Sequence, residues 1–450
     1  MILSVIAVYV FIQMAIAAYV ARGTKSDDDY LVAGRRLGVW PVALSLFATW
    51  FAAETVIATT AEVAESGLAG ARIEPFAYGL GILVLGLFVA GRLRKGGYIT
   101  VADFMRERFG GPAESLSALA IVVSATVWAS AQLFALAILI STSSEMSFSL
   151  ALIASTVVVM VYTLVGGLMG DVATDMIQGV ILSIGVGILL ILVLDAAGGV
   201  YAALDSIPSN RLQFNINGES WLQRIEIWII PIVGTITAQE AISRTLAARS
   251  PEVARKGAML GSAIYVLVGF IPVMIGFIAP HLGLELGVGD AFTSSLAQAL
   301  MPGWMYVIFV GALLSAILSS VDSALLSVSA VLTESGYRRF RPQMDQRESL
   351  WVARGATVAA GLFAFSIAAS GSGVRELVEA ANVIAGSYGV AMIIGLTTRK
   401  GGPITGAVSV LSAIVLLVWL SWIHEVDGGF IFAIIGSALT YWLVARFETQ

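Results

Sequence analysis

The segment GALLSAILSSVDSALLSVSAVLT, from Gly311 to Thr333, is apolar enough to cross a lipid bilayer but carries several hydroxyl groups and one carboxylate. If it is a helix, its small and hydroxyl-bearing residues share one face: Ala316, Ser319, Ser320, Ser323 and Ser327. Asp322 lies beside that face, and a carboxylate inside a membrane normally faces a partner, an ion path or water. Hydroxyl, carbonyl and carboxylate oxygens suit a small hard cation. Close helix packing explains the small residues and serines equally well, and Asp322 is what favours an ion site.

The composition identifies an integral membrane protein. Of 450 residues, 58% are hydrophobic and only 12% are charged, and apolar runs long enough to span a bilayer recur along the whole chain. The chain has no cysteine, and its two histidines, His281 and His424, fall at expected helix ends. A thiolate or imidazole metal centre is therefore not expected, and the sequence contains no P-loop, nucleotide fingerprint or Ser–His–Asp set. We expect neither an enzyme nor a nucleic-acid-binding protein.

The apolar runs predict an all-α polytopic protein with thirteen transmembrane helices in one domain. The expected spans are 2–21, 41–66, 75–93, 114–143, 148–166, 171–196, 224–248, 256–280, 302–334, 350–370, 374–397, 402–423 and 427–446. The first span lacks a basic N-terminal region and a cleavage site, so we interpret it as a helix and not as a signal peptide.

The basic residues predict the orientation. With the N-terminus outside, only four of the 25 lysines and arginines face outward, namely Arg72, Arg211, Arg224 and Arg375, which leaves 21 inside. This asymmetry obeys the positive-inside rule for a multi-pass protein of a cell membrane and places the C-terminus in the cytoplasm. Two outer connections are long, 198–223 and 281–302, and residues 290–300 of the second are expected to form an interfacial helix or a partial lid.

Four further regions carry polar groups inside expected spans. In 45–65 the deepest acid is Glu54, in a helix that no glycine or proline breaks. Trp128 and Gln132 are four residues apart and share a helix face; core packing is the more frequent role of such a tryptophan, but a buried amide needs partners. In 162–178 a tight turn at Gly166–Gly167 precedes Asp171, expected to cap the next helix, and Asp175, one turn deeper, is expected to face Asp322 or a cation.

The last of these regions, 228–249, has the clearest signal for a broken helix, because Pro231 is followed by Gly234. Beyond this break Gln239, Glu240 and Arg244 line up on the continuing helix. Glu240 and Arg244 are four residues apart, so a structural ion pair explains them as well as a functional site does. Asn382 in the eleventh span is an isolated polar candidate.

Five motifs together resemble the sodium/solute symporter family over nearly the whole chain. They are ATWF at 48–51, GYITVADFM at 97–105, YTLVGGLMGDVATDMIQ at 162–178, QEAISRTLAARS at 239–250 and SAILSSVDSALLS at 315–327. The resemblance implies the leucine-transporter-type fold, with inverted five-helix repeats whose first helices are broken. The repeats would be 41–196 and 224–397, preceded by an extra helix at 2–21 and followed by two C-terminal helices at 402–446.

The resemblance also implies two cation sites. A sodium ion would be held by the backbone carbonyls of Ala48, Phe51 and Ala316 and by the hydroxyls of Ser319 and Ser320. Some family members add a second cation site, which here would use Asp175, Ser319 and Ser323. Asp322 stands where that second site often has serine, so the ion stoichiometry stays open.

Within the family the choline-transporter branch is the most similar in its aromatic residues: Trp50, Tyr78 and Trp128. These would form an aromatic cage for an ammonium group through cation–π attraction. The cage tryptophan expected in the seventh span is replaced around Thr237, and the aromatic expected before Asn382 is absent. Glu54 and Glu240 would then recognise an amine by charge, and Gln132, Gln239 and Asn382 complete the expected solute site.

These observations predict a sodium-coupled symporter that imports a small polar solute, with a cationic amine or quaternary ammonium as the leading class. Sodium, the solute and the lipid bilayer are the expected partners, and a monomer is the expected working unit. The alternative is a proton-coupled transporter of an amino acid or sugar, in which Asp175 and Asp322 would be the protonatable groups.

Overall fold

The structure is a computed structural model that describes residues 8, 11–12, 15–16, 19–20, 22, 27–52, 54–144, 146–289, 291–371 and 373–448. The predicted first span, 2–21, lies for the most part outside these residues. The elements up to the first long connection are α2 (Asp27–Val32), η1 (Ala33–Arg35), α3 (Val39–Trp50), η2 (Glu54–Ala58), α4 (Thr59–Ser66), η3 (Gly67–Ala71), η4 (Arg72–Ala77), α5 (Tyr78–Val84), η5 (Leu85–Ala90), α6 (Gly91–Gly96), α7 (Val101–Phe109), α8 (Gly111–Ser143), α9 (Phe148–Ala196) and α10 (Val200–Asp205).

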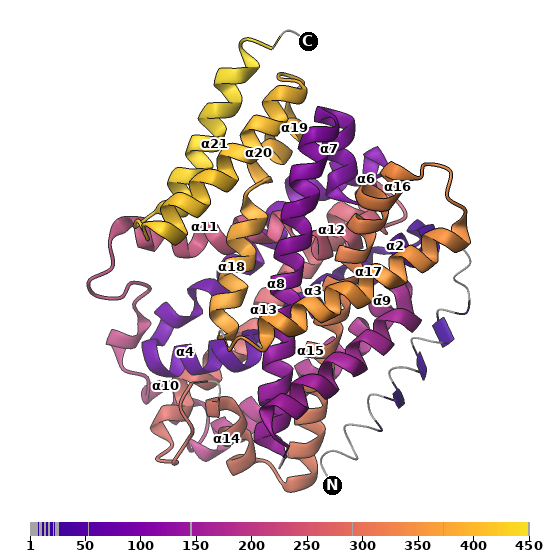
Figure 1. The fold of residues 1–450 in the computed structure, drawn as a ribbon. Coiled ribbons are helices and arrows are strands. Elements are labelled where there is room, and N and C mark those ends of the chain that lie inside the picture. The colour runs from indigo at the N-terminus through magenta and orange to yellow at the C-terminus, as the bar shows by residue number, and fades with distance from the viewer. Residues whose placement is uncertain are drawn as a thin grey trace.

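The remaining elements are also helical. They are η6 (Ser209–Leu212), α11 (Trp221–Thr237), α12 (Gln239–Leu246), α13 (Pro251–Ile278), η7 (Ala279–His281), α14 (Ala291–Leu300), α15 (Gly303–Val331), η8 (Leu332–Tyr337), α16 (Arg338–Phe340), α17 (Gln346–Ala368), α18 (Val374–Gly386), α19 (Gly389–Thr397), α20 (Pro403–Leu417), η9 (Val418–Ile423) and α21 (Gly429–Ala445). Figure 1 shows α7, α16 and the C-terminus at one end of the molecule and α10 and α14 at the other.

The described helices agree with a multi-pass membrane protein. Among the described residues, seven helices are long and apolar enough to cross a membrane, or nine if each of two bent pairs forms one span. Three shorter apolar helices add to these: Val39–Trp50, Phe148–Leu164 and Gly429–Ala445. The predicted total of thirteen spans stays a prediction. The two spans predicted at 148–166 and 171–196 meet at Gly167, whose φ of 58° breaks the helix and whose missing Cβ leaves room for the Tyr30 ring.

The segment from Gly311 to Thr333 lies at the centre of the bundle. Every residue of α15 from Phe309 to Val331 is buried, and α15 packs against both α8 and α9. A helix that is apolar nearly all round, with only small polar residues on one face, can be enclosed in this way. The polar face of α15 therefore meets protein and not lipid.

The helix expected across 41–66 is interrupted, although no glycine or proline marks the site. Helix α3 ends at Trp50, where the amide of Ala52 donates to the Trp50 carbonyl at 3.0 Å instead of continuing the helical ladder. Hydroxyls replace the missing helical donors: Thr55 donates to the Trp50 carbonyl at 2.8 Å and Ser320 to the Thr49 carbonyl at 3.1 Å. The interruption agrees with the broken first helix that the family resemblance implies. The intact helix that the absence of glycine and proline favoured does not form, because tertiary contacts satisfy the freed carbonyls.

The second predicted break exists but lies further along the chain. Pro231 stays inside α11, and the chain bends by 43° between α11 and α12, at Ala238. The Tyr388 hydroxyl donates to the Thr237 carbonyl just before the bend. Gly234 is needed for packing, since a Cβ there would come within 2.1 Å of the Asn382 side-chain oxygen. The prediction of a broken helix in this segment was therefore correct, but the prediction that the break lies at Pro231 was wrong.

The C-terminal hairpin of α20 and α21 is closed by Glu448. Its carboxylate accepts hydrogen bonds from the amides of Gly402, Ile404 and Thr405 and from the Thr405 hydroxyl, at 2.5 to 2.9 Å. These groups form the N-terminus of α20, where a negative charge is favoured. Burial raises the pKa of Glu448, but the four hydrogen bonds outweigh it and bring the pKa down to about 2.

We expect Glu448→Gln to lower the melting temperature in detergent by about 2 °C at pH 7, the effect of losing one helix cap worth about 1 kcal/mol. Because the folded pKa is depressed below the ordinary 4.5, this stabilisation is present above pH 4.5 and is lost as the pH falls toward 2. The wild type and the variant should thus converge at low pH. Glu285→Gln, on an exposed loop, is the control, and an unchanged melting temperature in Glu448→Gln would contradict the proposed clamp.

Candidate functional site

The first polar layer lies where the broken end of α3 meets α15. The Ser320 hydroxyl donates to the carbonyls of Thr49, at 3.1 Å, and Ala316, at 3.2 Å, and the Ser319 hydroxyl donates to Ala316 at 3.3 Å. Because the Ala52 amide turns toward Trp50, the Ala48 carbonyl loses its regular helical donor. Hydroxyls and carbonyls thus converge from two helices in a fully buried place.

The residue types in this layer fit a sodium ion. Each hydroxyl uses its single proton on a carbonyl and keeps oxygen lone pairs that can face a cation. Sodium is small and hard, and a set of neutral oxygens suits such an ion without a large charge imbalance. Of the five predicted ligands, Ala48, Phe51, Ala316, Ser319 and Ser320, all lie at the α3–α15 junction; their role as ligands stays a prediction.

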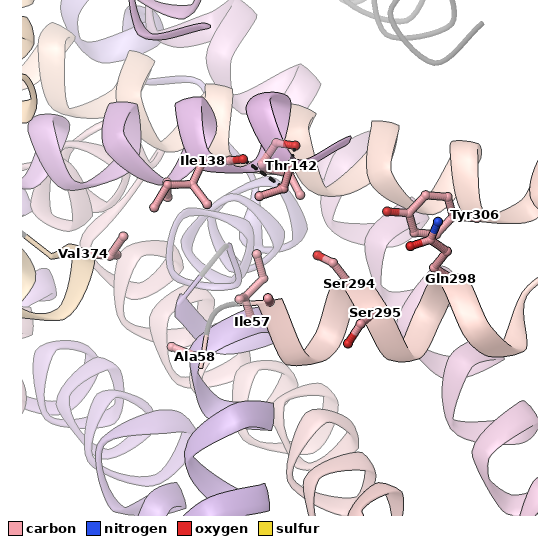
Figure 2. Close-up of a pocket in the computed structure, with 12 residues that line it drawn as sticks. Ile57, Ala58, Ile138, Thr142, Ser294, Ser295, Gln298, Tyr306 and Val374 are labelled. Atoms are coloured by element: carbon pink, nitrogen blue, oxygen red, sulfur yellow. Dashed lines mark hydrogen bonds between the residues drawn. The ribbon is translucent and has the colours of Figure 1, made fainter. Parts of the chain in front are cut away.

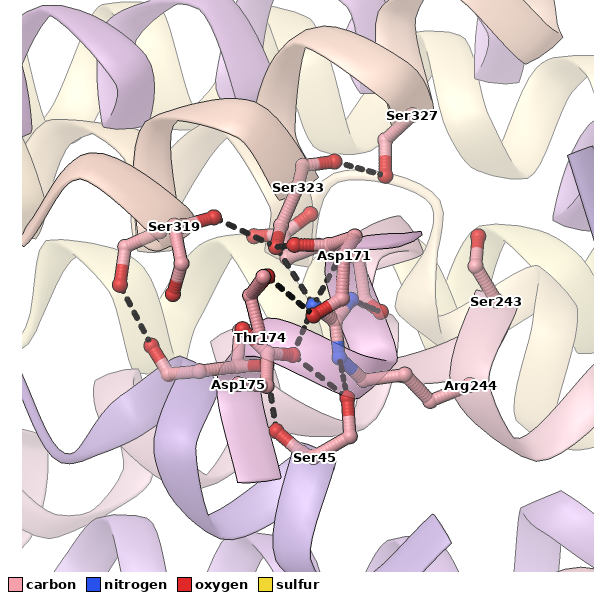
Figure 3. Close-up of polar contacts among 12 residues, drawn as sticks. Ser45, Asp171, Thr174, Asp175, Ser243, Arg244, Ser319, Ser323 and Ser327 are labelled. Atoms are coloured by element: carbon pink, nitrogen blue, oxygen red, sulfur yellow. Dashed lines mark hydrogen bonds and ion pairs between the residues drawn. The ribbon is translucent and has the colours of Figure 1, made fainter. Parts of the chain in front are cut away.

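The second polar layer is built around the guanidinium of Arg244. From α12 it donates to Ser45 on α3 at 2.8 Å and to two acids on α9, Asp171 at 2.8 Å and Asp175 at 2.9 Å. It also donates to the Ser323 hydroxyl on α15 and, through its other amino group, to the Glu240 carbonyl at 2.9 Å. Figure 3 shows the guanidinium enclosed between Asp171, Asp175 and Ser45. Arg244 and both acids are completely buried.

Two interpretations of this layer need correction, and one residue of it was missed. Arg244 pairs with Asp171 and Asp175 and not with the Glu240 carboxylate, because the bend at Ala238 directs Arg244 into the bundle. Asp171 was predicted to cap a helix, but it lies inside α9, beyond the break at Gly167. Its carboxylate instead forms a buried ion pair with Arg244. Ser45 accepts a hydrogen bond from Arg244 and donates one to Asp175 at 2.6 Å, and it was not predicted from the sequence. Its position one turn before Ala48 is the only local signal that could have indicated this role.

Asp322 contributes a further buried carboxylate to this region. It is fully buried near Thr163 and Asp171, and neither of its oxygens has a partner in hydrogen-bond geometry among the described residues. Asp171 and Asp175 pair with the Arg244 guanidinium, and Asp322 is a third buried carboxyl group in the same region. The predicted second cation position at Asp175, Asp322 and Ser323 is thus a place where a protein cation already contacts Asp175 and Ser323.

The predicted aromatic residues do come together. The ring centroids of Trp50 and Trp128 are 5.8 Å apart, and those of Trp50 and Tyr78 are 6.5 Å apart in an edge-on arrangement. The Asn382 amide nitrogen donates to the Tyr78 hydroxyl at 2.7 Å. Four helices, α3, α5, α8 and α18, thereby contribute to one buried aromatic cluster: Trp50, Tyr78, Trp128 and Asn382. No described residue ties the indole nitrogens of the two tryptophans into a hydrogen bond.

The other predicted solute-site residues divide into two groups. Gln132 is buried on α8, on the same face as Trp128, while Glu54 has a side chain that lies outside the described residues. The Thr237 hydroxyl donates a hydrogen bond to a carbonyl of its own helix. The side-chain oxygen of Gln239 accepts a hydrogen bond from the backbone N–H of Val101, and its side-chain nitrogen donates one to the Ser243 hydroxyl. Gln239 therefore anchors α12 to the start of α7, away from the aromatic cluster. Glu240 is buried beside this anchor.

A cavity of about 890 Å³ leads to the aromatic cluster from the end expected to face outward. Tyr78 and Asn382 line its floor, and we call it the vestibule. A smaller chamber of about 230 Å³ adjoins it, sharing Ala58 and Val374 as lining residues. Figure 2 shows this chamber between the C-terminal end of α8, with Ile138 and Thr142, and α14, with Ser294, Ser295 and Gln298. The region predicted as an interfacial helix or lid, 290–300, thus forms one wall of the chamber.

Comparisons with known proteins agree with this geometry. The sequence pattern of the Sodium:solute symporter family matches residues 30–399. The high-affinity choline transporter 1 of Drosophila melanogaster is 26% identical over 76% of this chain, which spans only 57% of that relative. The sodium/proline symporter of Escherichia coli is 28% identical over 95% of this chain and 90% of its own length. The solved structure of a Na+-coupled sialic acid symporter, in a substrate-bound outward-open state, superposes with a TM-score of 0.87 at 17% identity, over 100% of this chain and 98% of that one.

We expect Arg244→Met to destabilise the protein by about 3–5 kcal/mol, since it leaves Asp171 and Asp175 buried without a compensating cation. The additional change Asp175→Asn should recover a large part of the loss, because it removes one of the two uncompensated charges. Thermal unfolding of purified protein in detergent measures both effects. If Arg244→Met unfolds at the wild-type temperature, the guanidinium is not what holds these helices together.

Proposed function

Because this chain belongs to the sodium:solute symporter family, we propose that it is a secondary transporter that couples inward sodium movement to the uptake of a small polar organic solute. Family members are transporters and not enzymes. The observation that carries the proposal is the first polar layer, in which the interrupted α3 presents carbonyl oxygens to the hydroxyls of α15. Freed carbonyls at a broken helix are a recurring way to hold sodium in the middle of a membrane.

In this proposal sodium binds between Ala48, Phe51, Ala316, Ser319 and Ser320. The ion would join α3 to α15 by replacing hydroxyl-to-carbonyl hydrogen bonds with stronger ion–oxygen contacts. Sodium binding therefore favours the arrangement in which the two helices are close. Coupling follows if this arrangement is also the one that binds the solute, since a ligand can shift a conformational equilibrium only through differential affinity.

We propose that one sodium ion accompanies each solute. Arg244 already places a positive charge against Asp175 and Ser323, so a second cation in that layer would have to displace it or to settle beside Asp322. Like charges a few ångströms apart in a low-dielectric interior repel strongly. This repulsion supports the proposal that the guanidinium of Arg244 occupies the place of a second cation.

The proposed solute site is the aromatic cluster at the floor of the vestibule. Aromatic rings and nearby acids favour a cationic amine or a quaternary ammonium over an anion. One matched relative is a choline transporter, which supports this class, whereas the proline and glucose symporters among the relatives keep other small solutes in view. Proton coupling with an amino acid or sugar remains the alternative, because Asp322 has no hydrogen-bond partner among the described residues.

Alternating access completes the proposal. The interruptions after α3 and between α11 and α12 lie at the starts of the two proposed inverted repeats, 41–196 and 224–397. Rocking of one bundle against the other would open the site to each side in turn. With the C-terminus in the cytoplasm, as the basic residues predict, the vestibule opens outward and the structure corresponds to an outward-facing state.

The direct test is uptake into proteoliposomes loaded with potassium, with radiolabelled choline, proline and glucose as separate probes. We expect an inward sodium gradient to drive accumulation of at least one probe, and replacement of external sodium by potassium to abolish it. Accumulation that follows a proton gradient equally well without sodium would establish the alternative and refute sodium coupling.

A second test addresses the sodium ligands. Ser320→Ala removes one hydroxyl oxygen from the first layer, and we expect the sodium concentration for half-maximal uptake to rise about tenfold, which corresponds to roughly 1.4 kcal/mol. Ser329→Ala is the matched control, because Ser329 is also buried on α15 but donates to Ala353 on α17. Equal sodium dependence in the two variants would remove Ser320 from the proposed site.

A further inference from the structure

We infer that the solute is a protonated amine that keeps at least one N–H group, which the vestibule attracts by charge and Asn382 receives by a hydrogen bond. This inference rests on the proposed function and narrows its solute class. Two independent features of the vestibule carry it, the excess of carboxyl groups in its walls and an unfilled hydrogen-bond acceptor at its floor.

The walls of the vestibule are strongly acidic. Among the residues that the structure describes, its lining contains eight carboxyl groups and one guanidinium, that of Arg375. The carboxyl groups belong to Glu62, Glu65, Glu74, Glu226, Glu376, Glu379, Glu425 and Asp427. Arg375 is engaged with Glu62 at 2.6 Å, so it offsets only one of them. Among the described residues, Glu65, Glu376, Glu379 and Glu425 form no ion pair, and all four are exposed.

Such a lining selects solutes by the sign of their net charge before they reach the floor of the vestibule. A concave surface with one sign of charge raises the local concentration of oppositely charged ligands and speeds their association, an effect that salt screens. Zwitterions gain little from it and anions are repelled. The acidic walls thus provide a reason for a cationic solute that is separate from the aromatic rings below them.

The floor adds a requirement for a hydrogen-bond donor. Asn382 is only 7% exposed, lines the vestibule, and gives its amide nitrogen to the Tyr78 hydroxyl. Its side-chain oxygen accepts no hydrogen bond from any described residue. A nearly buried acceptor that is left unfilled in a complex weakens binding, because it loses its hydrogen bond to water and gains none in return. A quaternary ammonium has no N–H to fill it, whereas a primary, secondary or tertiary ammonium does.

The aromatic residues are arranged in agreement with this requirement. Trp50 and Trp128 are close to each other, with Tyr78 set edge-on to Trp50, but Asn382 packs on Gly234 of α11 and not on another ring. A full cage surrounds a quaternary ammonium with aromatic faces. Here the Asn382 amide nitrogen is held by the Tyr78 hydroxyl and its amide oxygen stays beside the rings as an acceptor. This arrangement favours a cation with one apolar side and one N–H.

The test is a methylation series in which charge and hydroxyl group stay constant: ethanolamine, N-methylethanolamine, N,N-dimethylethanolamine and choline. Affinity is measured with the full-length protein in detergent, from the thermal shift as a function of ligand concentration, in sodium and in potassium. We expect the first three ligands to bind in sodium and choline to bind about tenfold more weakly. Choline binding as tightly as dimethylethanolamine would overturn the requirement for an N–H.

Two variants separate the floor from the walls. Asn382→Leu removes the acceptor, so the four ligands should bind equally weakly, while Asn382→Asp keeps an acceptor and should retain the order of the series. If Asn382→Leu does not fold, Asn382→Asp still decides, because loss of the order in that variant contradicts the assignment. An unchanged order in a folded Asn382→Leu would also overturn it.

For the walls, Glu376→Gln/Glu379→Gln should slow association of ethanolamine several-fold at low salt and weaken its dependence on ionic strength. The matched control is Asp195→Asn/Asp205→Asn, which removes two exposed acids outside the vestibule. Equal association rates in the two double variants would refute steering by the vestibule. If proline or glucose accumulates with sodium while no amine binds, the solute inference fails and the proposed symport stands; if no probe depends on sodium, the symport itself fails.

Discussion

The buried guanidinium of Arg244 is the interaction on which the arrangement of the central helices depends. It contacts side chains on α3, α9 and α15 from its own position on α12. An arginine suits this role because its planar fork holds several partners at fixed angles and stays charged. Buried charges of this kind add little net stability, but removal of one partner is costly, so the network specifies which helices meet and at what depth.

That network also separates the two polar layers of α15. Ser319 and Ser320 bond to carbonyls at the end of α3, while Ser323, one turn further, belongs to Arg244 and Asp171. A protein cation in one layer and neutral oxygens in the other give the same helix face two different electrostatic environments. The neutral layer suits sodium, and the charged layer fixes the geometry around it.

The half of the protein that contains the vestibule depends on a different physical interaction. Its vestibule is lined by acidic residues, several of them exposed. These residues attract cations by long-range electrostatics and not by close contact. At the floor the proposed recognition is short-range, through the aromatic rings and the Asn382 side chain, whose amide nitrogen is held by the Tyr78 hydroxyl. In the proposed function a solute would meet selection by charge first and selection by hydrogen bonding second, with the proposed sodium site directly beyond Trp50, the last residue of α3.

The sequence by itself determined the class of protein and its apolar helical segments, because apolar length is a local property. Its motifs also carried the family resemblance, and it was this resemblance that implied the approach of ATWF to the serines of α15. The tertiary structure alone decided where the helices break and which charges pair. The break at Trp50 has no glycine or proline, since hydroxyls from Thr55 and Ser320 stabilise it. Glu240 lies nearer to Arg244 in sequence than the acids of α9, yet the bend at Ala238 turns Arg244 toward Asp171 and Asp175. Such pairings depend on helices far apart in the chain, and no local pattern records them.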